Sequence, residues 1–206
     1  ACNLFHIGYI LLLDRFDEDD KEYGTVMARF LHQLQERGIK TSIDVVSNST
    51  GDYAKKIIPA LSYADYVIIN EVEVCNVWGE NPRHEDGTIN VSAILRAMKK
   101  TMACGVREKV VIHAKEAGFC LSADGSFTKL GSLKIPSEMI EGSVGAGDAF
   151  CAGCLYAIYN DYSDEQMLTF ASAAAACNLF SENSVDGMRN QKEIWKLADS
   201  YERYPI

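Results

Sequence analysis

The hydrophobic residues of this chain repeat in two different ways, and the two patterns alternate along the sequence. Short apolar or β-branched runs at residues 4–13, 40–46, 66–70 and 109–113 are typical of buried strands. Between them, at residues 27–34, 53–61 and 95–102, apolar side chains recur every three or four positions, as on one face of a helix. Because strand–helix–strand units cross over with one hand, this order predicts a mostly parallel sheet covered by helices.

The pattern changes after His113. Two β-rich runs flank Asp124-Gly125, which predicts a hairpin and therefore antiparallel strands at one edge of the sheet. The remaining chain predicts helices over residues 148–160, 163–180 and 190–201. Capping boxes are expected at two helix starts, Ser163 with Gln166 and Asn190 with Glu193. A polar loop is expected over residues 44–51. We find no linker or repeat, and expect one α/β domain over residues 1–206.

Charge and cysteine content exclude several classes of protein. The chain has 29 acidic and 20 basic residues and a net charge of −9, which disfavours binding to nucleic acid. No apolar run reaches the ~20 residues that span a bilayer, so we expect no membrane partner. Seven scattered cysteines predict reduced thiols and a cytoplasmic location. Cys151 and Cys154 have C-x-x-C spacing, but no second pair has zinc-ligand spacing, and we interpret them as small buried side chains.

The glycine-rich stretch of residues 142–147 precedes a predicted helix. Small residues at this position expose the free N–H groups and the positive dipole end of the helix, which is a ready site for an anion. The order G-x-x-G-x-G is the reverse of the dinucleotide fingerprint, and Asp148-Ala149 stands where a P-loop has Lys-Ser or Lys-Thr. A carboxylate suits this place if it accepts the proton of a hydroxyl while the amides hold a transferred phosphoryl group. The alternative is a tight packing turn, with Asp148 favoured by the helix dipole.

Four stretches resemble the PfkB/ribokinase family of carbohydrate and nucleoside kinases. Residues 145–153 resemble its C-terminal signature, and residues 64–73 resemble the strand that delivers its N-x-x-E motif. Residues 110–112, followed by Gly118, fall where a nucleotide-contacting strand and loop belong, and residues 170–174 match an alanine-rich helix along the adenine site. The likeness covers about residues 4–180. It implies a ribokinase-like three-layer α/β/α sandwich whose mostly parallel sheet has an antiparallel hairpin at one edge.

The resemblance also implies an activity, the ATP-dependent transfer of the γ-phosphoryl group to a hydroxyl of a sugar or related small molecule. Asp148 would be the catalytic base, and the backbone N–H groups of Gly145, Ala146 and Gly147 would form the anion hole. Magnesium would be held through water by Asn70 and Glu73, as suits a cation that keeps part of its hydration shell. The implied nucleotide-contacting residues are His113, Lys115, Gly118 and Ser172. ATP and Mg²⁺ are the implied cofactors, and a homodimer is the candidate assembly.

The sequence departs from the family pattern at several positions. His113-Ala114-Lys115 stands where Thr-x-Gly is usual, Ser172 where asparagine is common, and Gly142 where an acidic residue helps several members hold a monovalent cation. Nothing matches the family's N-terminal glycine-pair signature, sugar-contacting carboxylates and β-lid. We therefore interpret the chain as the nucleotide-binding and catalytic part of a kinase, inactive by itself, whose acceptor the sequence does not identify. The alternatives are a non-catalytic nucleotide-binding fragment or pseudokinase, and a vitamin or nucleoside kinase.

Overall fold

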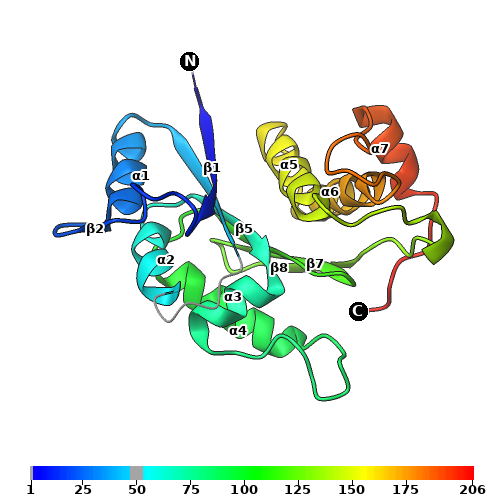
Figure 1. Ribbon diagram of the computed structural model, residues 1–206, viewed down its shortest axis with the longest axis horizontal. Coiled ribbons are helices and arrows are strands. Elements are labelled where there is room, and N and C mark those ends of the chain that lie inside the picture. The colour runs from blue at the N-terminus through cyan, green and yellow to red at the C-terminus, as the bar shows by residue number, and fades with distance from the viewer. Residues whose placement is uncertain (1, 47–52) are drawn as a thin grey trace. The chain divides into compact units, whose positions relative to one another are not determined.

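The computed structural model describes residues 2–46 and 53–206 (Figure 1). Six strands form one sheet in the order β1-β4-β5-β6-β7-β8, and β4 pairs in parallel with both β1 and β5. The strands are β1 (Leu4–Ile10), β4 (Lys40–Val45), β5 (Tyr66–Asn70), β6 (Lys109–His113), β7 (Ala117–Ser122) and β8 (Phe127–Gly131). A separate antiparallel pair joins β2 (Asp19–Asp20) and β3 (Gly24–Thr25). The predicted α/β fold with a mostly parallel sheet is confirmed.

The chain divides into two compact units. The first contains residues 1–112 and 121–126, and the second contains residues 113–120 and 127–206. The helices of the first unit are α1 (Val26–Glu36), α2 (Tyr53–Leu61), α3 (Glu71–Trp78) and α4 (Val91–Ala103). The second unit contains the 3-10 helix η1 (Ser137–Met139) and the helices α5 (Ala146–Tyr159), α6 (Asp164–Asn178) and α7 (Gln191–Ala198). The prediction of a single domain stays a prediction.

The core of the first unit is built on its central strands. Ile43 of β4, Val67 and Ile68 of β5, and Val110 of β6 are all fully buried. The predicted boundaries of β5, β6 and α2 agree with the structure, and Figure 1 shows α1 beside α2. The structure describes the predicted loop over residues 44–51 only as far as residue 46, and its remainder lies outside the described residues.

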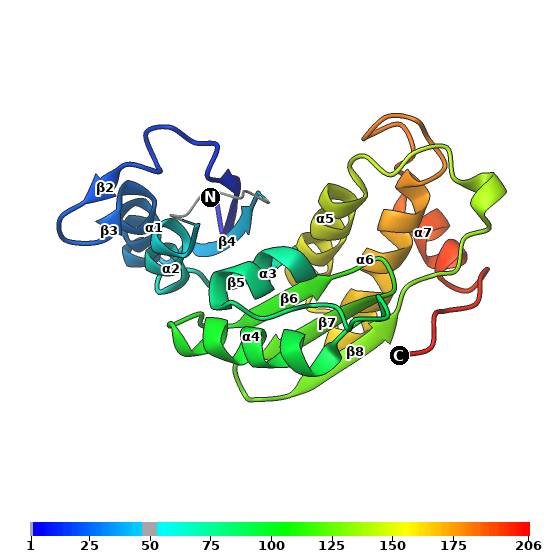
Figure 2. The ribbon, with the colours of Figure 1, turned by 60° about the horizontal axis from the view of Figure 1, so that its bottom comes forward.

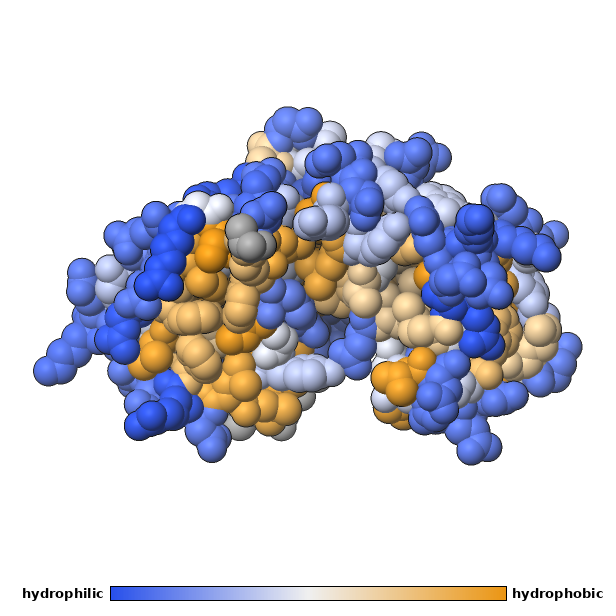
Figure 3. Space-filling model, turned by 90° about the horizontal axis from the view of Figure 1, so that it is seen from above, coloured by the Kyte–Doolittle hydropathy of each residue, from blue (hydrophilic) through white to orange (hydrophobic). Residues whose placement is uncertain are grey.

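The strand β1 ends earlier than predicted, at Ile10 rather than at residue 13. Tyr9 and Leu11 both have positive φ angles, 61° and 86°, so the extended conformation breaks within the apolar run. Hydrophobic side chains of this unit gather at the surface in Figure 3, and the exposed ones include Tyr9 and Leu12. Among the described strands, β1 lies at the end of the order of the sheet, and its residues include no Asp, Glu, Lys or Arg.

The helices of the second unit pack closely through small residues, and Figure 2 shows them gathered together. A Cβ added at Gly153 of α5 would lie 2.7 Å from Cα of Ala171 in α6, so only glycine permits this approach. Phe170 of α6 and Trp195 of α7 pack with ring centroids 5.3 Å apart. Ser163 and Asn190 begin α6 and α7 with the predicted capping boxes. These contacts fix α5, whose first turn carries the predicted catalytic carboxylate.

The C-x-x-C pair belongs to the core of this unit. Cys151 and Cys154 are buried on α5, and burial raises the pKa of the Cys154 thiol, as expected of inert packing residues. Within the described ranges, no three His, Cys, Asp or Glu side chains form a group that could hold a metal ion. These findings confirm that the pair consists of buried side chains. Nor does any helix in those ranges combine the length and apolar character needed to cross a bilayer.

Candidate active site

The helix α5 begins at the glycine-rich turn without a side-chain cap. Its N-cap is Gly145, in the left-handed conformation with φ 83° and ψ −1°. A Cβ at this position would lie 2.5 Å from Cβ of Ser184, so both the backbone and the neighbouring loop require glycine. Among the α-helices whose N-cap residues the structure describes, the others all have a side-chain cap. The first turn of α5 therefore offers backbone donors to a ligand.

The end of α6 holds the glycine-rich turn in place. The side-chain amide of Asn178, which is fully buried, donates to the Val144 carbonyl at 2.7 Å. The backbone N–H of Glu141 donates to the Leu179 carbonyl at 2.9 Å. A Cβ at Gly142 would lie 2.8 Å from the Ser181 carbonyl oxygen. A side chain at this position thus has no room here without a shift of the neighbouring backbone, which gives a physical reason for glycine at residue 142.

The predicted base and anion-hole residues lie together at the start of α5. Asp148 is in the first helical turn and is exposed to solvent. The N–H of Ala146 already donates to the Ser143 carbonyl, but at 3.3 Å this is a long hydrogen bond that a stronger acceptor could replace. Gly147 and Ala146 both line a cavity, described below. The structure thus brings a carboxylate to a helix terminus whose donors have no side-chain cap.

His113, at the end of β6, packs against the same helix. Its ring lies 5.1 Å from the ring of Phe150, and a Cβ at Gly147 would lie 3.1 Å from Cε1 of His113. Burial lowers the pKa of His113 from 6.5 to about 4, and the negative charge of Asp148 only partly opposes this effect. The imidazole is therefore neutral at physiological pH.

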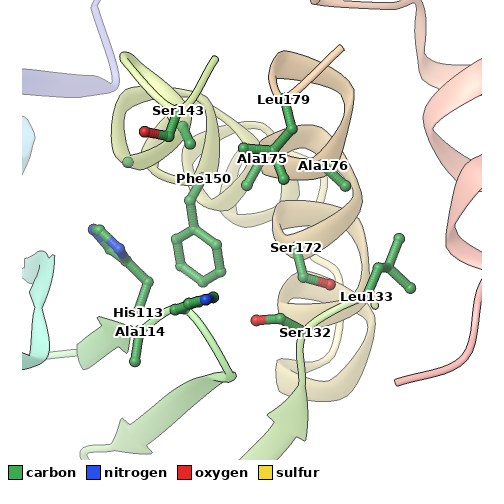
Figure 4. A pocket seen from close by; sticks show the side chains of 13 residues that line it. His113, Ala114, Ser132, Leu133, Ser143, Phe150, Ser172, Ala175, Ala176 and Leu179 are labelled. Carbon is green, nitrogen blue, oxygen red and sulfur yellow. The ribbon is translucent and has the colours of Figure 1, made fainter. Parts of the chain in front are cut away.

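A cavity of about 340 Å³ lies beside the first turn of α5 (Figure 4). Its walls come from the turn after β6, the segment after β8, the start of α5 and one face of α6. Most of the wall is apolar, and the hydroxyl groups come from Ser132, Ser143 and Ser172. The volume and the lining suit a small organic molecule with a flat apolar part and a few polar atoms. The lining residues are His113, Ala114, Lys115, Ser132, Leu133, Ser143, Ala146, Gly147, Phe150, Ser172, Ala175, Ala176 and Leu179.

Three of the four predicted nucleotide-contacting residues, His113, Lys115 and Ser172, line this cavity. Gly118 is placed differently, because it is buried in β7 behind the wall. A Cβ at Gly118 would lie 3.2 Å from Phe150 and 3.1 Å from Leu168. Gly118 therefore affects the cavity indirectly. Because it has no side chain, the ring of Phe150 has room to pack beside it.

The predicted magnesium residues lie in the first unit, at the start of α3. Asn70 is the N-cap, and its side-chain oxygen accepts from the N–H of Glu73 at 2.8 Å. The Glu73 carboxylate accepts from the N–H of Asn70 at 2.9 Å and is buried. The two residues thus form a third capping box, with the same spacing as the two that the sequence predicted. Their role toward magnesium stays a prediction.

Sequence reasoning missed several residues of the site. Phe150 and Leu133 look like ordinary core residues in the sequence, and Asn178 sits inside a helical pattern. Arg203 is the least visible, because it contacts the site from 31 residues away: its guanidinium donates to the Ser172 hydroxyl at 3.0 Å. The one local signal was the position of Phe150, two residues after Asp148 within the glycine-rich signature.

Comparison with known proteins gives one family and several relatives. The family model described as pfkB family carbohydrate kinase matches residues 14–191. Adenosine kinase of Schizosaccharomyces pombe is 32% identical over 108 residues, which are 52% of this chain and 31% of that protein. Ribokinase of Arabidopsis thaliana is 28% identical over 137 residues, 66% of this chain and 34% of that protein. The matches thus span about a third of the length of these relatives.

Solved structures share the fold. The complex of Arabidopsis thaliana ribokinase with ribose and ATP has a TM-score of 0.68 and 21% identity, and the match covers 84% of this chain and 52% of that one. A putative ribokinase II from E. coli, in complex with ATP and Mg²⁺, has a TM-score of 0.70 and 17% identity over 95% of this chain and 58% of that one. The predicted ribokinase-like fold is therefore confirmed.

Proposed function

Because the chain belongs to the pfkB family of carbohydrate kinases, we propose that the protein transfers the γ-phosphoryl group of ATP to a hydroxyl of a sugar or related small molecule. A nucleoside is included, since one relative is an adenosine kinase and another a ribokinase. The residues of the second unit would provide the nucleotide site and the catalytic base. The acceptor stays open within this chemical class.

One observation carries the proposal: Asp148 lies in the first turn of a helix whose N-terminus has no side-chain cap and borders a cavity. Phosphoryl transfer requires a group that takes up the hydroxyl proton and donors that stabilise the phosphoryl oxygens. A helix start provides such donors, and it carries a partial positive charge. The glycine-rich turn supports this reading further, because two of these amides belong to Gly145 and Gly147, which have no side chain.

The proposed reaction uses these groups as follows. The acceptor hydroxyl donates a hydrogen bond to the Asp148 carboxylate, and its oxygen attacks the γ-phosphorus. As the new O–P bond forms, the bond to the bridging oxygen breaks, ADP leaves and the proton passes to Asp148. The N–H groups of Gly145, Ala146 and Gly147 hold the phosphoryl oxygens. Because its lowered pKa keeps His113 neutral, its imidazole contributes no positive charge beside Asp148.

The cavity fits a nucleotide in size and character. Its apolar wall, which includes Phe150, Leu133 and Leu179, suits the flat faces of a purine, and its volume is within the range of ligand sites. Lys115 lines the cavity and is exposed, so its ammonium can reach a phosphate at the rim. Ser143, next to the glycine-rich turn, adds a hydroxyl at the same end.

Magnesium would neutralise charge that develops on the phosphates. The chain's candidate ligands for it, acting through water, are Asn70 and Glu73, whose oxygens are the type that Mg²⁺ prefers. Both residues are held rigidly by their capping box. The buried Glu73 carboxylate gives the start of α3 an oxygen ligand held in one position, which supports an outer-shell role.

Compartment and assembly are also part of the proposal. All seven cysteines are free, which supports a reducing compartment such as the cytoplasm. The exposed Tyr9 of β1 and the exposed Leu12 that follows this strand support association of two copies into a homodimer. The net charge of −9 supports a small-molecule substrate over nucleic acid.

The test is a direct assay of the protein. It is incubated with ATP and Mg²⁺ and, separately, with pentoses, hexoses and nucleosides, while ADP and phosphorylated products are measured by mass spectrometry. We expect phosphorylation of at least one acceptor when the chain is assayed within the whole protein, and none by residues 1–206 assayed by themselves. Binding of ATP without transfer to any acceptor would favour a non-catalytic nucleotide-binding protein. Failure to bind ATP at all would refute the assignment of the cavity as well.

A further inference from the structure

A short segment near residue 203 forms the outer side of the cavity wall. The N–H of Lys134 donates to the Glu202 carbonyl at 2.7 Å, and the N–H of Tyr204 donates to the Ser132 carbonyl at 3.0 Å. These antiparallel contacts tie residues 202–204 to residues 132–134, two of which line the cavity. They also hold the backbone of Arg203 at a fixed place beside the wall.

Arg203 reaches from this segment to a side chain inside the cavity. Its Nη1 donates to the Gly131 carbonyl at 2.8 Å and to the hydroxyl of Ser172 at 3.0 Å. Ser172 is a buried residue of α6, and its hydroxyl donates to the Thr169 carbonyl at 3.1 Å. The guanidinium itself is partly buried, so water competes little for its hydrogen bonds.

These partners fix which way the Ser172 hydroxyl can act. A guanidinium has no lone pair and can only donate, whereas a carbonyl oxygen can only accept. The single hydroxyl proton must therefore point to Thr169, and Arg203 occupies one of the two lone pairs. What Ser172 can still present to a ligand is one lone pair, so it acts only as a hydrogen-bond acceptor.

Ser172 lies at the end of the cavity where a nucleotide base would lie. In Figure 4, Ser143 marks the end next to the glycine-rich turn, and Ser172, Ser132 and Leu133 are at the other end. If phosphates bind at the start of α5, as the proposed function requires, the base must extend toward Ser172. A 6-amino purine has a hydrogen-bond donor there, whereas a 6-oxo purine has an acceptor, which would meet the lone pair of Ser172.

We propose that Arg203 and Ser172 together make the cavity select a 6-amino purine nucleotide over its 6-oxo counterpart. The inference rests on the proposed function, because it assumes that the cavity binds a nucleotide with its phosphates at α5. Ser172 is the residue that contacts the base, and Arg203 is a positioning residue that keeps the hydroxyl proton turned away from it.

The experiment compares ATP with inosine triphosphate, which has an oxygen in place of the 6-amino group. Binding of each nucleotide is measured by calorimetry on the wild-type chain and on four variants, with a thermal melt of each preparation. We expect the wild type to bind ATP about tenfold more tightly, as for one buried hydrogen bond gained or lost. Ser172→Ala should bring the ratio close to one, mainly by weakening ATP.

Two substitutions at Arg203 test the positioning role. Arg203→Met keeps the apolar stem but removes the donors, so the hydroxyl of Ser172 can turn and the ratio should fall. Arg203→Lys keeps a group that only donates, and should retain most of the discrimination. Ser200→Ala is the matched control, since it removes an exposed hydroxyl three residues from Arg203 that does not line the cavity, and it should leave the ratio unchanged.

The outcomes separate this inference from the function on which it rests. The inference is overturned if the wild type binds the two nucleotides with equal affinity. It is also overturned if the ratio of the two affinities is unchanged in both Ser172→Ala and Arg203→Met. Either result leaves the kinase proposal intact. Binding of neither nucleotide overturns the proposed function, and the inference with it. If Arg203→Met fails to fold, Ser172→Ala decides alone, because its only change is the loss of one hydroxyl.

Discussion

The start of α3 and the start of α5 were both predicted to serve a phosphate, but the chain builds them in opposite ways. At α3, Asn70 and Glu73 cap each other's backbone N–H groups, so the helix start already has its partners. At α5, Gly145 is the N-cap, no side chain caps the turn, and a cavity lies beside it. A capped helix start gains stability from its donors, whereas an uncapped one keeps them for a ligand.

The largest expected effect is at Asp148, which stands at the uncapped helix start. Asp148→Asn keeps the size of the side chain and removes its charge and basicity. We expect kcat of the proposed phosphoryl transfer to fall by about 10²–10⁴-fold, the range for a positioned base. ATP affinity and the melting temperature should change little, since the dipole interaction of an exposed acid is worth only ~0.3–1 kcal/mol.

Steady-state kinetics and a thermal melt on the same preparation check this prediction. A near-normal kcat with an intact fold would make Asp148 a structural residue. The start of α5 would then serve stability, as the capping box does at the start of α3.

The second prediction concerns the substitution Gly145→Ala, which changes the N-cap residue of the uncapped turn. Alanine at φ 83° is strained by about 1–2 kcal/mol, and its Cβ would collide with Ser184, which adds roughly 1–3 kcal/mol. We expect the free energy of unfolding to fall by the sum of the strain energy and the collision energy. We also expect ATP binding to weaken, because the turn that offers the backbone donors is displaced. The matched control is Gly79→Ala at the end of α3, where φ is 65° and no atom lies within 4 Å of the added Cβ.

The control should lose only the strain energy and keep its ATP affinity. Urea unfolding and ATP titration of both variants measure the difference. Equal losses in the two variants would mean that the Ser184 contact places no constraint on the turn.

The third prediction concerns pH and the neutral His113 beside α5. Its folded pKa of about 4 lies below the ordinary 6.5, so the unfolded chain binds the proton first as the pH falls. Stability should therefore be lost between about pH 6.5 and pH 4, by about 1–3 kcal/mol. His113→Gln should flatten this part of the curve.

Urea unfolding across that pH range measures the slope for wild type and variant. His84→Gln, which replaces an exposed histidine of the first unit, is the control and should leave the slope unchanged. An unchanged slope in His113→Gln would mean that acid loosens the protein elsewhere.

The smallest effects are expected at the capped start of α3. Asn70→Ala removes the cap and should cost about 0.5–2 kcal/mol of stability. Glu73→Gln separates capping from metal binding, because glutamine can still complete a capping box but has no charge. It should leave the melting temperature nearly unchanged and raise the magnesium concentration needed for half-maximal activity.

Thermal melts and magnesium titrations of both variants distinguish the two roles. If Glu73→Gln leaves the magnesium titration unchanged, the start of α3 contributes stability alone. Only the start of α5 would then have a role in ligand binding.

Local patterns predicted most of the fold, and the errors lie where backbone geometry or distant contacts decide. The runs that form β5 and β6 are bounded by polar residues, so their ends were visible in the sequence. The end of β1 could not be predicted, because a positive φ angle at Tyr9 or Leu11 does not change the apolar pattern of the sequence. The helix α5 begins two residues before its predicted start, because Gly145 rather than a polar residue is its N-cap.

The site was predictable where one short segment contains it. Residues 145–148 and the cavity residues His113, Lys115 and Ser172 were named in advance. The N-x-x-E spacing of Asn70 and Glu73 was interpreted as a metal motif, with a strand-end turn and a solvated helix acid as the alternatives, and not as a capping box, although the same spacing predicted two capping boxes correctly. Arg203 and Asn178 could not be found, because their partners are 31 and 34 residues away and no periodicity links them.

Alkylation of the cysteines can measure local unfolding of the second unit, because its thiols are buried whereas Cys2 is exposed. Cys2 is exposed, whereas Cys120, Cys151, Cys154 and Cys177, the thiols of the second unit, are all buried. An alkylating reagent should therefore modify Cys2 at once and reach the other four only when that unit opens. Mass spectrometry of peptides after timed alkylation would thus measure how often the region around the cavity unfolds, and whether ATP slows it, without any engineered label.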